Sequence, residues 1–256
     1  MSAVSAVLFF GVVGWLLVNS PNWEVFRQAF FDPEVFAESL PLILEAFWVN
    51  VQLFLICEVL VLVFGLLVAV VRNLPGPAFF PLRLVAIAYA DFFRGVPGIV
   101  IIYVLAFGLP SLGIEGVPDD GFFWAVVALT LIYSAYVSEV YRSGIDSVHP
   151  SQEAAARSLG LSRFGAMRYV VLPQAIRRVI PPLLNDFIGL QKDTALVGFV
   201  AVLEAFLQSQ VLSAATFNLT PYVVVALLFL LLTIPLARLV DWLVARDRRR
   251  YLASAR

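Results

Sequence analysis

The stretch WVNVQLFLICEVLVLVFGLLVAVV, residues 48–71, carries a single charged side chain, Glu58. A helix of about 20 apolar residues is long enough to cross the hydrocarbon core of a bilayer. In lipid the backbone must satisfy its own hydrogen bonds, and a helix does so within one segment. We therefore predict a transmembrane helix at this stretch.

Similar apolar stretches recur along the chain, and we expect further spans at 3–19, 84–109, 121–141, 178–207 and 220–244. Four polar side chains interrupt the 178–207 stretch: Asn185, Asp186, Lys192 and Asp193. This pattern favours two packed, interior-facing helical pieces over one lipid-facing rod. Residues 3–19 lack a basic leader and a small-residue cleavage site, so we interpret them as a retained anchor. The expected fold class is all-α, a polytopic transmembrane helical bundle of five or six spans.

The composition supports the bilayer as the main solvent. Hydrophobic residues make up 61% of the chain, charged residues 14%, and the mean hydropathy is +0.93. A soluble domain of 256 residues could not bury that much apolar surface. The net charge of −1 gives no reason to expect nucleic acid as a partner. The single Cys57 cannot form an internal disulfide, and the single His149 excludes a His-rich metal site, so we expect no metal.

The distribution of arginine predicts the orientation, because cytoplasmic loops carry an excess of basic residues. Segments 72–83 and 142–178 and the tail 246–256 are basic, and they alternate with segments that are acidic or uncharged. Six spans with both termini in the cytoplasm fit this alternation; five spans would leave the N-terminus outside. Residues 22–47 fit either an amphipathic helix in the outer interface or a connector with aromatic anchors. We divide the chain into 1–47 (an extra transmembrane helix and outer segment), a core at 48–245, and the cytoplasmic tail at 246–256.

The connection at 142–173 reads as a structured loop. Pro150 and Ser151 start a helix, Gly160 ends it, and Ser162 caps a second helix. The small residues permit close approach of another backbone or side chain, and the loop also has three large apolar side chains, Leu159, Leu161 and Phe164. This predicts a docking element for a partner protein, with a capped surface helix as the alternative. His149 is interpreted as a helix-flanking residue.

The same segment resembles the cytoplasmic "EAA" loop of ABC-importer permeases: Glu-Ala-Ala, three residues, Gly, nine residues, a β-branched residue, one residue, Leu-Pro. The second half matches without a gap, at Gly160, Val170, Leu172 and Pro173. Counting back from Gly160 places the triplet at 154–156, so the glutamate position of the family is Ala154. Glu153 lies one residue earlier, which is about 100° around a helix.

Further motifs follow in the order of the polar amino-acid permeases (histidine/glutamine type). They lie at 89–97 (YADFFRGVP), 134–145 (SAYVSEVYRSGI), 172–175 (LPQA), 181–185 (PPLLN) and 192–196 (KDTAL). The resemblance covers about residues 48–245, with departures at Val96, Ile101 and Ala195. It implies a type I ABC-importer permease in the cytoplasmic membrane that carries a polar or charged amino acid.

The resemblance also implies partners: a second permease copy or paralogue, two cytoplasmic ATPase subunits and an external substrate-binding protein. The chain has no Gly-x-x-x-x-Gly-Lys-Ser/Thr loop, so it is not expected to be an enzyme, and ATP and Mg would be bound by the ATPase subunits. The residues expected to couple to the ATPase are Gln152, Glu153, Ala154, Ala155, Ala156, Arg157, Leu159, Gly160 and Leu161.

Polar groups inside the membrane are candidates for the translocation pathway, because charges there must face protein or water. They are Glu58, Asp91, Arg94, Glu139, Asn185, Lys192, Asp193, Thr194 and Glu204. Glu58 fits a pathway carboxylate or the partner of an arginine. The i, i+3 spacing predicts ion pairs between Asp91 and Arg94 and between Glu139 and Arg142.

Two other classes of function predict features that the sequence lacks. A secondary transporter predicts inverted repeats, and we find no convincing repeat. A membrane enzyme predicts a catalytic set, and no Ser/His/Asp set, His-rich site or carboxylate pair is evident.

Overall fold

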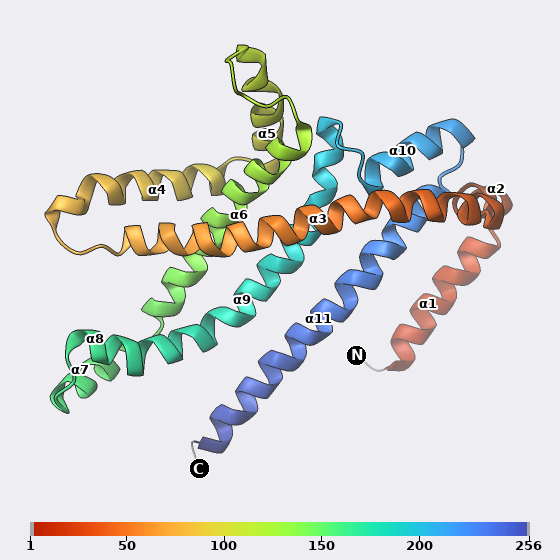
Figure 1. Cartoon of the computed structure of the whole chain (residues 1–256). Helices are drawn as coiled ribbons and strands as arrows, with labels where there is room; N and C mark the ends of the chain where they lie inside the picture. Colours follow the sequence, from red (N-terminus) through yellow and green to blue (C-terminus); the bar gives the residue numbers. More distant parts are fainter. Residues whose placement is uncertain (1–2, 255–256) are drawn as a thin grey trace.

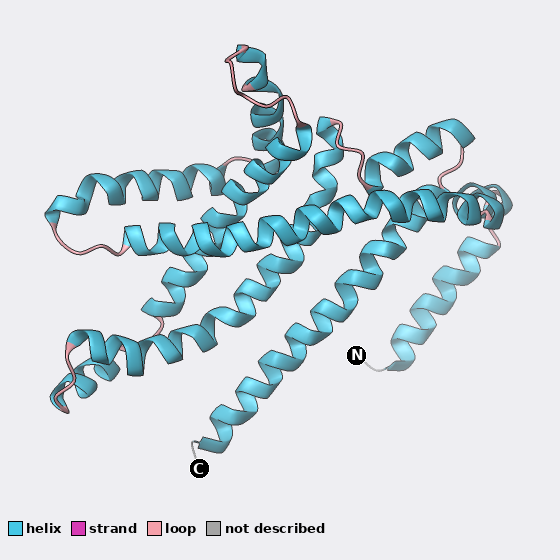
Figure 2. Cartoon of the chain, in the orientation of Figure 1, coloured by secondary structure: helices cyan, strands magenta, loops and turns pink. Residues whose placement is uncertain are grey.

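A computed structural model describes the backbone of residues 3–254 and the side chains of residues 4–246 (Figure 1). Helices dominate this part of the chain, and it contains no strand (Figure 2). The predicted all-α class is confirmed. The helices are α1 (Ala3–Val18), α2 (Trp23–Phe30), α3 (Pro33–Arg72), α4 (Phe80–Gly95), α5 (Gly98–Tyr103), α6 (Gly121–Asp146), α7 (Pro150–Ser158), α8 (Arg163–Ala166), α9 (Leu172–Asp193), α10 (Ala205–Thr216) and α11 (Thr220–Ser254). The predicted tail at 246–256 begins within α11, and its side chains beyond Arg246 lie outside the described residues.

Helix α3 is 40 residues long and contains the predicted span at 48–71. It starts earlier than expected because Asp32 caps it, accepting hydrogen bonds from the backbone N–H groups of Glu34 (2.9 Å) and Val35 (3.2 Å). Of the outer segment predicted at 22–47, only α2 is a separate amphipathic helix. Residues 33–47 are neither a connector nor a separate interfacial helix, since they form the first turns of α3.

Two of the predicted spans are bent. Residues 84–109 do not form one helix, because the helical segments on either side of Val96 and Pro97 meet at 107°. Pro97 has no N–H to donate, and it holds Val96 in an extended conformation (ψ 135°). The predicted break in 178–207 is confirmed, but it lies after the polar residues. There Ala201 takes a left-handed conformation (φ 62°), and the flanking segments meet at 52°.

By length and composition, three helices in the described part could cross a membrane: Trp23–Arg72, Gly121–Asp146 and Thr220–Arg246. Each bent pair adds one span if it crosses as a unit, which gives up to five. Helix α1 is apolar along its length, but with 16 residues it is too short to be counted among these spans. The predicted bundle of several spans is confirmed, with three to five candidate spans among the described residues.

Helix α3 runs across the middle of the molecule and crosses α6, while α9 and α11 pack beside them (Figure 1). Helices α7 and α8 lie at one end of the bundle, here called the α7 end, and α2 and α10 lie at the other, the α10 end. Close packing of α3 and α6 needs a glycine: a Cβ on Gly65 would lie 2.8 Å from Cγ1 of Val137. Gly144 has the same role between α6 and α9, against Val179.

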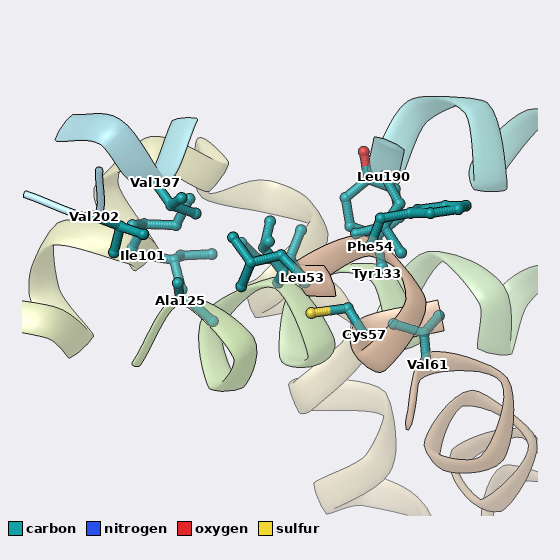
Figure 3. Close-up of a cluster of buried hydrophobic side chains, with 14 of the residues drawn as sticks. Leu53, Phe54, Cys57, Val61, Ile101, Ala125, Tyr133, Leu190, Val197 and Val202 are labelled. Atoms are coloured by element: carbon teal, nitrogen blue, oxygen red, sulfur yellow. The ribbon is translucent and has the colours of Figure 1, made fainter. Parts of the chain in front are cut away.

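The main apolar core joins α3, α5, α6 and α9 (Figure 3). Leu53 and Cys57 of α3 and Leu190 of α9 are fully buried in it. Tyr133 of α6 belongs to the same cluster, and its hydroxyl group donates a hydrogen bond to Asp193. This core therefore holds in place the helices that carry the polar residues described next.

Candidate functional site

The helical loop between α6 and α9 forms as the sequence predicts. Pro150 begins α7, and Nδ1 of His149 accepts a hydrogen bond from the backbone N–H of Ser151 (3.2 Å). Gly160 ends it with φ +92°, a left-handed conformation that favours glycine. Ser162 caps α8 by accepting from the N–H of Gly165 (3.1 Å). The predicted start, stop and second cap are confirmed, as is the helix-flanking place of His149.

The tip of this loop is apolar and exposed. Leu159 is 86% exposed and Phe164 is 72% exposed, and Leu161 lies between them in sequence. Along α7, Ala154 and Ala155 are exposed whereas Ala156 is buried. Exposed apolar side chains on a capped, rigid element are typical of a surface that a partner covers.

The carboxylate of Glu153 lies near Arg163, on the other side of the turn that ends α7. Its Oε1 lies 4.0 Å from Nε of Arg163, and its side chain is about half as exposed as that arginine's (35% against 80%). The register counted from Gly160 assigns the acidic position of the family to Ala154, which has an open face.

The base of the loop is attached to the bundle by packing and by one charged hydrogen bond. Val148, Val171 and Ala175 form a small buried cluster with Ile145 of α6 against them. Arg178 of α9 donates to the carbonyl oxygen of Ser147. The base of the loop therefore contacts both α6 and α9.

Three arginines converge on Glu139, and we call these four residues the Glu139 cluster. Oε1 accepts from Arg72 (2.6 Å) and lies 3.1 Å from Nη1 of Arg94, and Oε2 accepts from Arg142 (2.9 Å). The predicted pair of Glu139 with Arg142 is confirmed. The predicted pair of Asp91 with Arg94 is wrong: among the described side chains Arg94 pairs with Glu139 instead, because α6 crosses α4 at that level.

A polar cavity of about 220 Å³ lies where α5, α6 and α9 meet, and we call it the α5–α6–α9 pocket. Its lining residues are Val96, Gly98, Ile132, Tyr133, Tyr136, Asn185, Asp186, Gly189 and Asp193. The hydroxyl of Tyr133 donates to Oδ2 of Asp193 (2.8 Å). Oδ2 of Asp186 is buried and has no hydrogen-bond partner within the described part of the chain. The pocket has two carboxylates and no basic lining residue.

Two of the predicted pathway residues, Asn185 and Asp193, line this pocket. The prediction missed Asp186, which was noted only as an interruption of the apolar stretch, and the two tyrosines. A signal for Asp186 was present: seven residues from Asp193 is almost two full helical turns, so both carboxylates share one face of α9. Nothing in the sequence marked Tyr133 and Tyr136 as pocket residues, because tyrosine is common on transmembrane helices.

The other predicted pathway residues lie elsewhere. Glu204 is fully buried at the start of α10, where it accepts hydrogen bonds from Asn50 Nδ2 (3.0 Å) and two backbone N–H groups. Thr194 belongs to the same buried network through Asn50 (3.1 Å). These contacts make Glu204 and Thr194 parts of a helix-capping network. The remaining candidates do not line the pocket either: Glu58 is half-buried on α3, and Lys192 and Asp91 are exposed.

Comparison with known proteins identifies the family. The family model described as "Binding-protein-dependent transport system inner membrane component" matches residues 61–249. The probable glutamine ABC transporter permease protein GlnM of Bacillus subtilis (strain 168) is 42% identical over 190 residues, which cover 74% of this chain and 85% of that protein. The arginine transport system permease protein ArtQ of the same organism is 31% identical over 196 residues, covering 76% of this chain and 87% of ArtQ.

Solved structures agree. A chain from "Crystal structure of an amino acid ABC transporter with histidines" superposes with a TM-score of 0.75 at 31% identity, covering 82% of this chain and 96% of that one. A permease chain of the MetNI methionine ABC transporter shares the fold, with a TM-score of 0.64 at 20% identity over 80% of this chain and 95% of its own. These proteins are transport components and not catalytic enzymes. The chain therefore belongs to the family of binding-protein-dependent transport system inner membrane components, and its relatives there are amino-acid ABC transporter permeases.

Proposed function

We propose that the chain is the permease subunit of an ATP-driven importer that moves a polar or charged amino acid across the cytoplasmic membrane. It pairs with a second permease subunit, two cytoplasmic ATPase subunits, which bind ATP and Mg, and an external substrate-binding protein. The α7 end and the C-terminus face the cytoplasm, as the arginine-rich segments suggest. Residues 48–245 act as the transport core.

The exposed tip of the helical loop is the observation that carries this proposal. Leu159 and Phe164 project from a capped, rigid turn whose base is packed on α6 and α9. ATP-driven closure of the ATPases would push on α7 and tilt these two helices. Since α6 and α9 also line the α5–α6–α9 pocket, the push would change access to it.

The pocket supports an amino acid as the cargo. Every amino acid carries an α-ammonium group, and the two carboxylates of the pocket would stabilise that charge inside the membrane. The names of the relatives cover glutamine, arginine and glutamate transport, which spans neutral, basic and acidic side chains. What these substrates share is the main-chain ammonium and carboxylate.

Co-purification with the ATPase tests the docking role of α7. We expect Leu159→Asp to remove the ATPase from the purified complex and to abolish ATP-dependent uptake. Phe217→Asp is the matched control, because Phe217 is 95% exposed and lies at the α10 end, far along the chain from the loop. If Leu159→Asp and Gly160→Pro both keep the ATPase bound and uptake intact, the proposal is wrong.

A further inference from the structure

We propose that Arg94 binds the α-carboxylate of the transported amino acid while Asp186 and Asp193 bind its α-ammonium group. This inference deepens the proposed function and rests on it. The two carboxylates of the pocket and the guanidinium of Arg94 then act as the two charged ends of one site for a zwitterion, and the ring of Tyr136 contacts both the pocket and Arg94.

The acidic end of the site lacks a counter-charge. Oδ2 of Asp186 has no hydrogen-bond partner in the described part of the chain, and Asp193 has only a tyrosine hydroxyl on its Oδ2. An unpaired carboxylate inside the membrane is costly, so it favours a cation that enters the pocket. An ammonium group carries three donors, enough to reach both carboxylates.

The basic end adjoins the same cavity. Arg94 lies in the last turn of α4, two residues before Val96, which lines the pocket. Its guanidinium carbon lies 5.9 Å from the ring centre of Tyr136, another lining residue. A carboxylate seated beside Tyr136 is therefore within reach of the long arginine side chain.

Of the three arginines, Arg94 is the one whose ion pair with Glu139 can break while the other two pairs remain. Three guanidinium groups share two carboxylates, because Arg142 also pairs with Asp146 (2.8 Å). The Arg94 contact is the longest of the three to Glu139, at 3.1 Å, and its side chain is 38% exposed against 10% for Arg72. If Arg94 turns toward a ligand, Glu139 keeps Arg72 and Arg142. A guanidinium offers two parallel N–H groups, a geometry that suits a carboxylate.

The test uses the purified complex of this chain with its ATPase and compares amino acids with their α-amides. L-glutamine and L-arginine serve as probes, together with L-glutamine α-amide and L-argininamide, which keep the ammonium group but lose the carboxylate charge. Binding is measured by calorimetry and by the thermal shift at millimolar ligand. We expect the wild type to bind at least one amino acid about 10- to 100-fold more tightly than its amide, since a charge-assisted hydrogen bond is lost.

Arg94→Gln should reduce this preference to nearly one, and Arg94→Lys should keep part of it because the charge remains. Arg72→Gln is the matched control: it removes another arginine of the Glu139 cluster that does not adjoin the pocket, and the preference should persist. A preference that survives in Arg94→Gln overturns the inference, as does a wild type that binds none of the probes. Absence of ATP-driven uptake by the wild-type importer would instead contradict the proposed function.

Discussion

Replacing Glu139 by glutamine removes the carboxylate on which Arg72, Arg94 and Arg142 converge. Glutamine has nearly the same shape, so packing between α3, α4 and α6 stays intact. Arg142 keeps its second partner, Asp146, and Arg94 keeps the ring of Tyr136. Arg72, at the end of α3, is left without a counter-charge among the described side chains.

The solvent exposure of each side chain decides which ion pair contributes most to the loss of folding free energy. The side chains of Arg72 and Glu139 are 10% and 19% exposed, and removing one partner of a buried pair costs about 3–5 kcal/mol. Those of Arg94 and Arg142 are 38% and 39% exposed, so solvent screens these pairs, and each contributes at most about 1 kcal/mol. Because glutamine keeps one acceptor oxygen, we expect Glu139→Gln to lower the free energy of unfolding by about 3 kcal/mol.

A double-mutant cycle with Arg72→Gln measures the pairwise part, using reversible unfolding in mixed micelles. Residues in contact show coupling energies of about 0.5–3 kcal/mol, and we expect the upper half of that range. The exposed pair of Arg238 and Asp241 on α11 (3.0 Å) is the control, with an expected coupling below about 1 kcal/mol. A coupling at Glu139 no larger than the control would refute the reasoning.

Three further outcomes are expected. Gly160→Ala places a side chain at φ +92°, so it should destabilise the turn by about 1–2 kcal/mol and raise hydrogen exchange across 150–166; unchanged exchange would contradict this. Ala154→Glu should keep or improve the coupling of ATP hydrolysis to uptake, whereas Glu153→Ala loses only the 4.0 Å contact with Arg163 and should leave uptake unchanged; loss of uptake in the second variant alone would count against the register. Asp186→Asn should weaken amino-acid binding by about tenfold while leaving the thermal midpoint unchanged or higher, because it removes an unpaired charge; equal binding would contradict the role of Asp186.

The helical loop was predicted almost completely from the sequence. Its start at Pro150, its stop at Gly160 and its second cap at Ser162 are all found. These signals are local, since a cap or a left-handed turn depends on a few consecutive residues. The bend at Pro97 was also signalled locally, but 84–109 was predicted as one span because most of its residues are apolar.

The pocket and the Glu139 cluster were predicted only in part. Asn185, Asp193, Arg94 and Glu139 were all candidates, but of their partners only Arg142 was predicted. The i, i+3 rule identified Arg142 and failed for Asp91, because a residue on a crossing helix offered Arg94 a better contact. Glu204 and Thr194 were candidates for the pathway, and the hydrogen bonds that they make to Asn50 and to the start of α10 could not be predicted.

The sequence by itself determined that the bilayer is the solvent, where the helical loop lies, and which family the chain resembles, because hydropathy, caps and motifs belong to contiguous segments. Only the tertiary structure decided which charges meet. Arg72 and Glu139 are 67 residues apart along the chain, and their 2.6 Å contact depends on how α3 and α6 cross. That crossing depends on close approach at Gly65 and on the shared apolar core. Charge pairing between helices is therefore a consequence of packing, which no single segment of the sequence specifies.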